Sequence, residues 1–322
     1  MELPQPTAER AAPTLARRAQ PSGQPRSGQP RSQLRSVSLR WMLLGPPLLI
    51  VLLTVIYPLA SAFVTSFRDW RLIYSPNPGP FVGLANYSRA LSDGGFLNAL
   101  RVSVLYTVIS VTLTLLIGLS IALLLSKPTR LNVFARTLLI LPFAVAPLLK
   151  GYSWRFMLDP DAGVYARMIG AVVPPLRGFV WLGHEFTALL SLAMSEVWGW
   201  APLFALMFIG ALGSIPAETT EAAKMDGASG LQIFFRITLP LLSPVIFIVA
   251  LLKVISAFKL FDQVVVMTGG GPGDSTQTLY YYVYQLAFRN LDMGYASAVS
   301  YLVVALMAIF AALYVRVLLR ER

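Results

Sequence analysis

Cysteine is absent from this sequence of 322 residues, and histidine occurs once, at His184. Without cysteine the chain can form neither a disulfide nor a thiolate metal site, and one histidine cannot build a histidine metal cluster. Charged residues are also scarce, at 13% against 56% hydrophobic residues. With a mean hydropathy of +0.65 and several apolar runs of about 18 residues or more, a soluble domain with an ordinary surface is excluded. The composition indicates a polytopic membrane protein without a metal site.

The apolar runs predict six membrane-spanning helices, each bounded by charge, proline or glycine. None shows the alternation over about ten residues that a membrane-spanning strand needs, so a β-barrel is excluded. The expected fold is therefore all-α. The predicted spans are roughly 41–66, 101–126, 137–157, 187–212, 241–266 and 296–317.

The distribution of lysine and arginine predicts the orientation of the spans. With the amino terminus in the cytoplasm, the cytoplasmic segments hold fifteen of the 26 basic residues, and the opposite side holds nine. The other two, Lys253 and Lys259, fall in the fifth predicted span. Acidic residues run the other way, with six on the cytoplasmic side and seven outside. Both termini and the loop at 213–240 are therefore expected in the cytoplasm.

Residues 1–40 have no apolar periodicity and contain a direct repeat, Ser-Gly-Gln-Pro-Arg at 22–26 and again at 27–31. Seven arginines and two acidic residues make this segment basic. We expect a disordered cytoplasmic tail near the anionic inner leaflet, and no nucleic acid partner is needed to explain it. The apolar run that follows is too long for a cleaved signal peptide, so an uncleaved first span is expected at 41–66.

A polar stretch between the fourth and fifth predicted spans reads Glu-Ala-Ala-Lys-Met-Asp-Gly at 221–227, and Ile-Thr-Leu-Pro follows at 237–240. The spacing predicts a short helix on the membrane surface over residues 216–235. Pro216 fits a first helical turn, acidic residues favour its positive end, and Gly227 permits a sharp bend.

This stretch resembles the EAA loop of permease subunits in binding-protein-dependent ABC importers, the cytoplasmic element that docks on an ATP-hydrolysing partner. The resemblance implies a six-helix permease domain over 41–322 in the type I importer fold, with a coupling helix in the loop at 213–240. It assigns ATPase coupling to Glu221, Ala222, Ala223, Asp226, Gly227, Ile237, Leu239 and Pro240.

Three further segments resemble the carbohydrate-importing branch of this family: 81–87 (Phe-Val-Gly-Leu-Ala-Asn-Tyr), 261–262 (Phe-Asp) and 268–272 (Thr-Gly-Gly-Gly-Pro). The resemblance implies a sugar or polyol solute, as in the maltose, trehalose, polyol and glycerol-phosphate permeases. It also implies a second permease that is a different chain, two ATPase subunits, an external solute-binding protein, and a bacterial or archaeal plasma membrane. ATP and magnesium would be used by the ATPase, with no cofactor on this chain.

The glycine-rich segment at 269–276 is not a phosphate-binding loop, because the G-x-x-x-x-G-K-[ST] pattern lacks its lysine here and Pro272 removes an N–H. The chain is therefore expected to have no catalytic residue and no ATPase site. Tyr280, Tyr281, Tyr282 and Tyr284, which follow this loop, are expected to form an interfacial belt or a docking surface.

Charged residues at membrane depth are costly, so Glu196 and Lys253 are candidates for the solute pathway. Because the fourth and fifth spans run antiparallel, the two lie at comparable depth and could pair. A polar and small stripe follows Lys253 at helical spacing, and aromatic residues follow Glu196. The full set of pathway candidates is Glu196, Trp198, Gly199, Trp200, Lys253, Ser256, Ala257 and Leu260.

Structural roles remain open for the same residues. The tryptophans could be packing or interfacial residues, Glu196 with Lys253 could lock two helices together, and Lys259 with Asp262 could form a local helix pair. A neutral sugar or polyol fits a pathway whose two charges cancel, whereas glycerol phosphate would need excess positive charge.

Another class of transporter is also open. An ion-coupled secondary transporter would use Glu196 and Asp262 as ion sites, although the two halves of the chain show no convincing repeat. A membrane-embedded enzyme would need a nucleophile, metal cluster or paired acids at span depth, and none is apparent.

Overall fold

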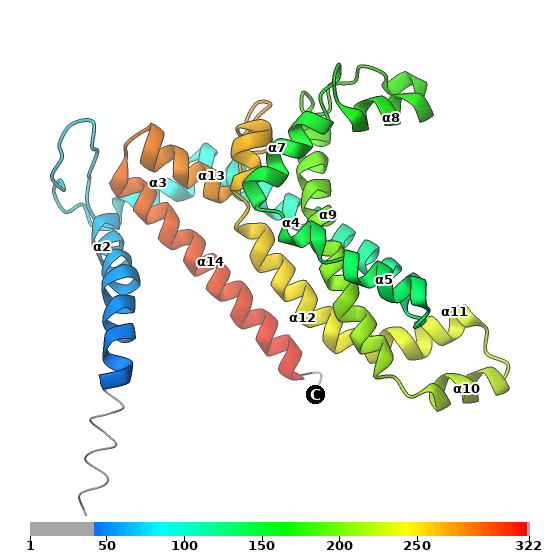
Figure 1. Cartoon of the computed structure of the whole chain (residues 1–322). Coiled ribbons are helices and arrows are strands. Elements are labelled where there is room, and N and C mark those ends of the chain that lie inside the picture. Colours follow the sequence, from blue (N-terminus) through cyan, green and yellow to red (C-terminus); the bar gives the residue numbers. More distant parts are fainter. Residues whose placement is uncertain (1–41, 321–322) are drawn as a thin grey trace, which may run out of the picture. The chain divides into compact units, whose positions relative to one another are not determined.

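The computed structural model describes residues 42–320 (Figure 1). The predicted basic tail at 1–40 lies outside the described residues and stays a prediction. The chain divides into two units, Met1–Tyr57 and Pro58–Arg322. In the first unit the described residues are helical, and they open the first span, Met42–Ser66. The second unit holds the other spans and the residues of the candidate sites.

The described residues confirm the all-α prediction: they form helices and two isolated antiparallel bridges. Five helices are long and apolar enough to cross a membrane, and a sixth crossing exists if one bent helix pair counts as a span. The five are Met42–Ser66, which contains α2 (Tyr57–Ser66), α4 (Gly94–Leu125), α9 (Glu185–Gly213), Gly230–Phe258, which contains α11 (Gly230–Ile233) and α12 (Leu239–Phe258), and α14 (Met293–Arg320). Shorter elements are α3 (Ala85–Ser92), α8 (Val164–Val172), η2 (Pro174–Leu176), α10 (Ala217–Met225) and α13 (Leu279–Tyr284), and single π-helical turns occupy Leu52–Ile56, Phe234–Thr238, Val264–Thr268 and Gln285–Arg289.

The third predicted span, 137–157, is not one straight helix. The chain here forms α5 (Arg130–Leu138), α6 (Leu141–Ala144) and α7 (Pro147–Met157), with a bend of 97° before α7. Pro147 begins α7, and Ala146 before it is extended, with ψ of 137°. A residue before proline is sterically disfavoured in the helical region, so the break lies where the sequence requires it.

The fifth predicted span, 241–266, is shifted in the structure. Its helix begins at Gly230 and ends at Phe258. Pro240 does not stop it, because this proline lies in the first turn of α12, directly after a wider π turn. The chain leaves the helix at Lys259 and becomes helical again at Asp262.

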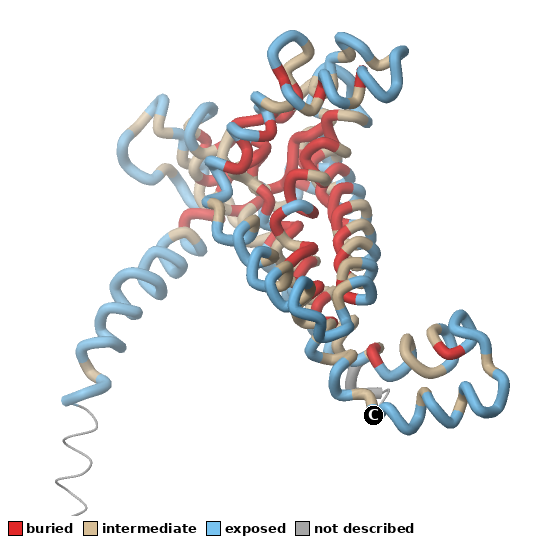
Figure 2. Tube along the Cα trace, turned by 45° about the vertical axis from the view of Figure 1, so that its right-hand side comes forward, coloured by how far each residue is buried: buried red, intermediate tan, exposed pale blue. Residues whose placement is uncertain are grey.

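Much of the core of the second unit lies where α4, α9 and α12 pack together (Figure 2), and a further cluster of buried residues joins α3, α13 and α14 to the start of α4. The buried face of α4 is rich in small and hydroxyl residues, among them Thr114, Gly118 and Ala122. An added Cβ at Gly118 would lie 3.1 Å from the carbonyl oxygen of Ala201, so the two backbones approach closely. Close approach through small residues is typical of helix packing in membranes.

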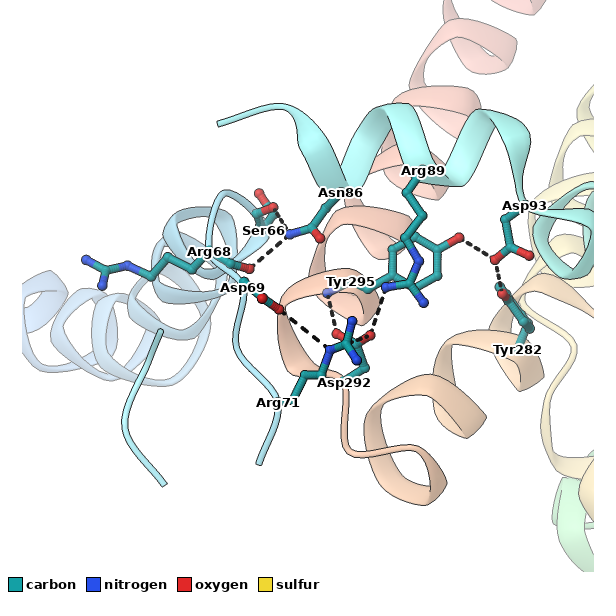
Figure 3. A network of polar contacts seen from close by, with 10 residues as sticks. All are labelled: Ser66, Arg68, Asp69, Arg71, Asn86, Arg89, Asp93, Tyr282, Asp292 and Tyr295. Carbon is teal, nitrogen blue, oxygen red and sulfur yellow. Dashed lines mark hydrogen bonds and ion pairs between the residues drawn. The ribbon is translucent and has the colours of Figure 1, made fainter. Parts of the chain in front are cut away.

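Polar contacts fasten the segment after the first span to the rest of the unit (Figure 3). The amide of Asn86, in the segment predicted as a motif at 81–87, donates to the carbonyl oxygens of Ser66 and Arg68, both at 2.9 Å. Arg89 pairs with Asp292 at 3.0 Å, at the start of α14. The motif thus has a clear structural use, because it ties α3 to the chain that leaves the first span.

Asp93 joins three helices at the same end of the unit. Its side chain caps α4 by accepting from the N–H of Gly95, and it also accepts hydrogen bonds from Tyr282 and Tyr295. Burial raises the pKa of the Asp93 carboxyl, but these hydrogen bonds together outweigh burial, so its pKa lies below the ordinary value of 3.8. The ionised carboxylate therefore stabilises this junction.

We expect Asp93→Asn to lower the thermal stability of the purified transporter at pH 7 by about 1–3 kcal/mol, because a charged acceptor for buried donors is lost. The pKa of Asp93 is lower in the folded protein than in the unfolded chain. Its ionised carboxylate therefore stabilises the fold fully above the unfolded pKa, and this stabilisation is lost as the pH falls through the folded pKa. The difference between wild type and variant should therefore shrink below about pH 4. Melting temperatures in detergent between pH 7 and pH 3 measure this, with the exposed Asp161→Asn as control. A difference that stays constant over this range contradicts the assignment.

Candidate functional site

A buried ionic cluster surrounds Glu196, in the middle of α9. Lys150 of α7 and Lys253 of α12 both pair with its carboxylate, Lys253 at 3.2 Å from Oε2. Gln263 donates to Oε1 at 2.6 Å. The exposed fractions are 5% for Glu196, 5% for Lys150 and 0% for Lys253. Four segments of the chain therefore converge on one carboxylate.

The cluster holds more positive than negative charge. Among the described residues, Glu196 is the one acid that pairs with either lysine. Lys253 also lies 5.4 Å from the centroid of the Trp200 ring, within reach of a cation–π interaction. Charges this deeply buried are stable only when paired and hydrogen-bonded, so the carboxylate is essential to both lysines.

A cavity of about 550 Å³ opens beside the cluster. Its wall carries aromatic rings, a hydroxyl and charged side chains from α6, α7, α9 and α12 and from the segment after α12. The lining residues are Pro142, Phe143, Val145, Pro147, Lys150, Glu196, Gly199, Trp200, Leu252, Ile255, Ser256, Lys259, Leu260, Phe261, Asp262 and Gln263. The volume and the mixed lining suit a small organic molecule.

The structure places most of the predicted pathway residues at this cavity. Glu196, Gly199, Trp200, Ser256 and Leu260 line it, and Lys253 lies behind Glu196 as its ion-pair partner. The 3.6-residue period explains Gly199 and Trp200, because residues three and four positions after Glu196 share its helix face.

Trp198 and Ala257 do not belong to the cavity wall. Two positions after Glu196, Trp198 lies on the opposite face of α9 and is 39% exposed. Ala257 packs in a hydrophobic cluster with Leu192 and Val264 and is 1% exposed. Lys259 and Asp262 both line the cavity, and within the described part of the chain they form no ion pair with each other.

Sequence reasoning missed Lys150 and Gln263. The charge count assigns Lys150 to the external side, whereas the structure buries it against Glu196. A lysine inside the apolar run 137–157, three residues after a proline, is the signal that could have revealed it. Gln263 is uncharged and follows the Phe-Asp motif, so no comparable signal marks it.

The polar stretch after α9 forms a second candidate surface. The helix α10 has no buried residue, and Met225 at its end is 89% exposed. Gly227 has a φ of +79°, which favours glycine, and the N–H of Ala228 closes the turn on the carbonyl oxygen of Ala223 at 2.9 Å. In Figure 1, α10 lies beyond the ends of α9 and α12.

The predicted helix over 216–235 is therefore two helices. It breaks at Gly227, and a capping box of Ser229 and Gln232 starts the next helix at Gly230. Because that helix continues to Phe258, the predicted coupling residues Ile237, Leu239 and Pro240 lie in the span. Glu221, Ala222, Ala223, Asp226 and Gly227 remain in the exposed helix and its turn.

The tyrosines after the glycine-rich segment do not all form an exposed belt. Tyr281 is 1% exposed and donates to the carbonyl oxygen of Gly269 at 2.8 Å, and Tyr282 is buried beside Asp93. An added Cβ at Gly270, where φ is +90°, would lie 2.7 Å from the Tyr281 ring. The glycines of this loop therefore allow it to close over a buried tyrosine.

The fold, the ionic cavity and the exposed helix between α9 and α12 define a membrane permease. Residues 114–321 match the family described as binding-protein-dependent transport system inner membrane components. The chain belongs to this family. It is therefore an ABC importer permease subunit, in which ATP hydrolysis is the task of separate subunits, and the resemblance indicated by the motifs is confirmed.

Two relatives match almost the whole chain. The trehalose/maltose transport system permease protein MalF of Thermococcus litoralis is 33% identical over 286 residues, 88% of this chain and 94% of that protein. The sn-glycerol-3-phosphate transport system permease protein UgpA of Rhizobium meliloti is 33% identical over 275 residues, 83% of this chain and 90% of that protein.

The fold is similar to that of a chain in the crystal structure of a bacterial ABC transporter involved in the import of the acidic polysaccharide alginate. The TM-score is 0.75 at 17% identity, and the match covers 89% of this chain and 97% of that one. This likeness confirms the predicted importer permease fold.

We expect Glu196→Ala to destabilise the folded transporter strongly, by about 3–5 kcal/mol, because two buried lysines lose their counter-charge. The matched control is Glu185→Ala, an exposed glutamate in the first turn of the same helix, which should cost less than about 1 kcal/mol. Thermal unfolding of both variants in detergent measures the difference. Equal melting temperatures for Glu196→Ala and wild type would show that the cluster does not stabilise the fold.

Proposed function

We propose that this chain forms part of the pathway of an ATP-driven importer for a sugar, disaccharide or polyol solute, and that solute passes through the cavity beside Glu196. The observation that carries the proposal is the cavity itself. Trp200 offers a face for the C–H groups of a sugar ring, while Ser256, Gln263 and the charged cluster offer partners for hydroxyl groups. The relatives named for trehalose/maltose and for sn-glycerol-3-phosphate support this class of solute.

The helix α10 is proposed as the coupling helix that docks on an ATPase subunit. Its exposed Glu221 would contact the ATPase, the small side chains of Ala222 and Ala223 would allow close packing, and Gly227 provides the turn. The helices on both sides of α10 carry the ionic cluster: Glu196 is on α9 and Lys253 is on α12.

This arrangement provides a physical route from ATP to solute. From Gly230 the helix runs unbroken to Lys253, about 35 Å away at 1.5 Å per residue. On the other side, α9 runs from Glu196 to Gly213, about 26 Å. Because helices transmit displacement along their axes, movement of α10 by the ATPase would shift Glu196 against Lys253 and reshape the cavity between them.

The proposal includes the remaining partners and the orientation. A second permease, a different chain, would complete the pathway, two ATPase subunits would use ATP and magnesium, and an external binding protein would deliver the solute. Both termini and α10 would lie in the cytoplasm of a bacterial or archaeal cell, in agreement with the distribution of basic residues.

Uptake into proteoliposomes tests the proposal. The transporter, assembled from this chain and the permease and ATPase encoded beside it, should accumulate a labelled sugar, polyol or sugar derivative when ATP is inside and the binding protein is outside. Uptake driven by a proton or sodium gradient without ATP would contradict it, and would make Glu196 and Asp262 candidate ion sites.

We expect Glu221→Ala and Gly227→Val each to abolish ATP-driven uptake while the transporter still assembles in the membrane. The first removes the polar contact to the ATPase, and the second places a branched side chain where φ is +79°. Uptake is compared at equal membrane content, with the exposed Glu185→Gln at the far end of α9 as the matched control. Normal uptake by either coupling variant would refute the role of α10.

A further inference from the structure

The charges around the cavity do not cancel. The charged side chains that line it, Lys150, Lys259, Glu196 and Asp262, have a net charge of zero. Lys253 pairs with Glu196 without lining the cavity and adds one positive charge. Lys259 is exposed at the wall and Asp262 is half-buried, whereas Lys150, Glu196 and Lys253 are all at least 95% buried. The deep part of the cavity therefore has two ammonium groups and one carboxylate.

The Lys150 ammonium has donors that remain available to a ligand. An ammonium has three N–H groups, and among the described residues Glu196 is the one hydrogen-bond partner of Lys150. The Glu196 carboxylate also accepts hydrogen bonds from Gln263 and Lys253. Lys150 is thus a buried cation on a cavity wall, and two of its three donors have no partner in the described part of the chain.

Gly199 keeps this ammonium accessible. It lines the cavity beside Lys150, and an added Cβ would lie 3.2 Å from Nζ. A side chain at this position would therefore crowd the Lys150 ammonium. The absence of a side chain at Gly199 therefore leaves room for a ligand group to reach Nζ.

We propose that the cavity selects solutes with an anionic group, namely a carboxylate, sulfonate or phosphate on a sugar or polyol, and that this group binds the Lys150 ammonium. This inference rests on the proposed function and names the class of solute within it. Lys150 and Lys253 share one carboxylate, Glu196, so the cluster keeps one excess positive charge. Buried excess charge is costly, and an entering anion would neutralise it, which a neutral sugar cannot do. The names of the relatives leave the choice open, since one is named for trehalose/maltose and another for sn-glycerol-3-phosphate.

The test compares matched solutes in the assembled transporter with its binding protein. Labelled glucuronate is paired with glucose, and labelled sn-glycerol-3-phosphate with glycerol. We expect ATP-driven uptake of an anionic member to exceed that of its neutral partner by about tenfold or more. The affinity of the binding protein for each solute is measured separately, so that the uptake ratio can be corrected for the preference of the binding protein.

Variants then locate the selectivity in the cavity. Lys150→Gln should reduce the ratio of anionic to neutral uptake to about one, and Lys150→Arg, which keeps the charge, should retain the preference. Lys127→Gln is the control, because it removes an exposed lysine in the loop between α4 and α5. Gly199→Ala keeps every charge but crowds Nζ, so it should weaken anionic uptake more than neutral uptake even if Lys150→Gln fails to assemble.

The outcomes separate the two proposals. ATP-driven uptake in which neutral solutes equal or exceed their anionic partners overturns the anion inference and leaves the importer function intact. A ratio that neither Lys150→Gln nor Gly199→Ala changes also overturns it, because selection would then occur elsewhere. Absence of ATP-driven uptake for every solute contradicts the proposed function itself.

Discussion

The ion pairs of Glu196 are the interaction on which the rest of this membrane unit depends. One carboxylate on α9 holds Lys150 of α7, Lys253 of α12 and the amide of Gln263 after α12. In a low-dielectric interior each of these groups would be costly alone, so their positions are mutually fixed. The bent third segment, the long fifth span and the loop that follows it are thereby held around one cavity.

The same pairing relates the cavity to the exposed helix. Because Glu196 and Lys253 lie on the two helices that flank α10, the proposed force on α10 would reach both members of one ion pair. A buried pair of charges has few alternative arrangements, since separation exposes each to an apolar surrounding. A small displacement at α10 is therefore expected to switch the cavity between discrete states more readily than to deform it gradually.

Local patterns predicted some features and could not predict others. The stretch at 221–227 predicted a helix on the surface and a bend at Gly227, and the structure has both, since each follows from a few neighbouring residues. Glu196 and Lys253 were predictable because charges stand out in apolar spans. Lys150 contacts Glu196 from a helix that begins after a 97° bend at Pro147, and the prediction of one span over 137–157 did not include this bend. Trp198 does not line the cavity, because a helix face, and not proximity in sequence, decides which residues do.

The most direct test is a cryo-electron microscopy structure of the assembled transporter with its transported solute trapped during import. The solute should lie against Trp200, with a polar group about 2.7–3.2 Å from the Lys150 ammonium and with Glu196 bonded to both lysines. Solute density elsewhere in the membrane domain, with this cavity empty and Glu196 separated from Lys253, would contradict the central role of the buried carboxylate.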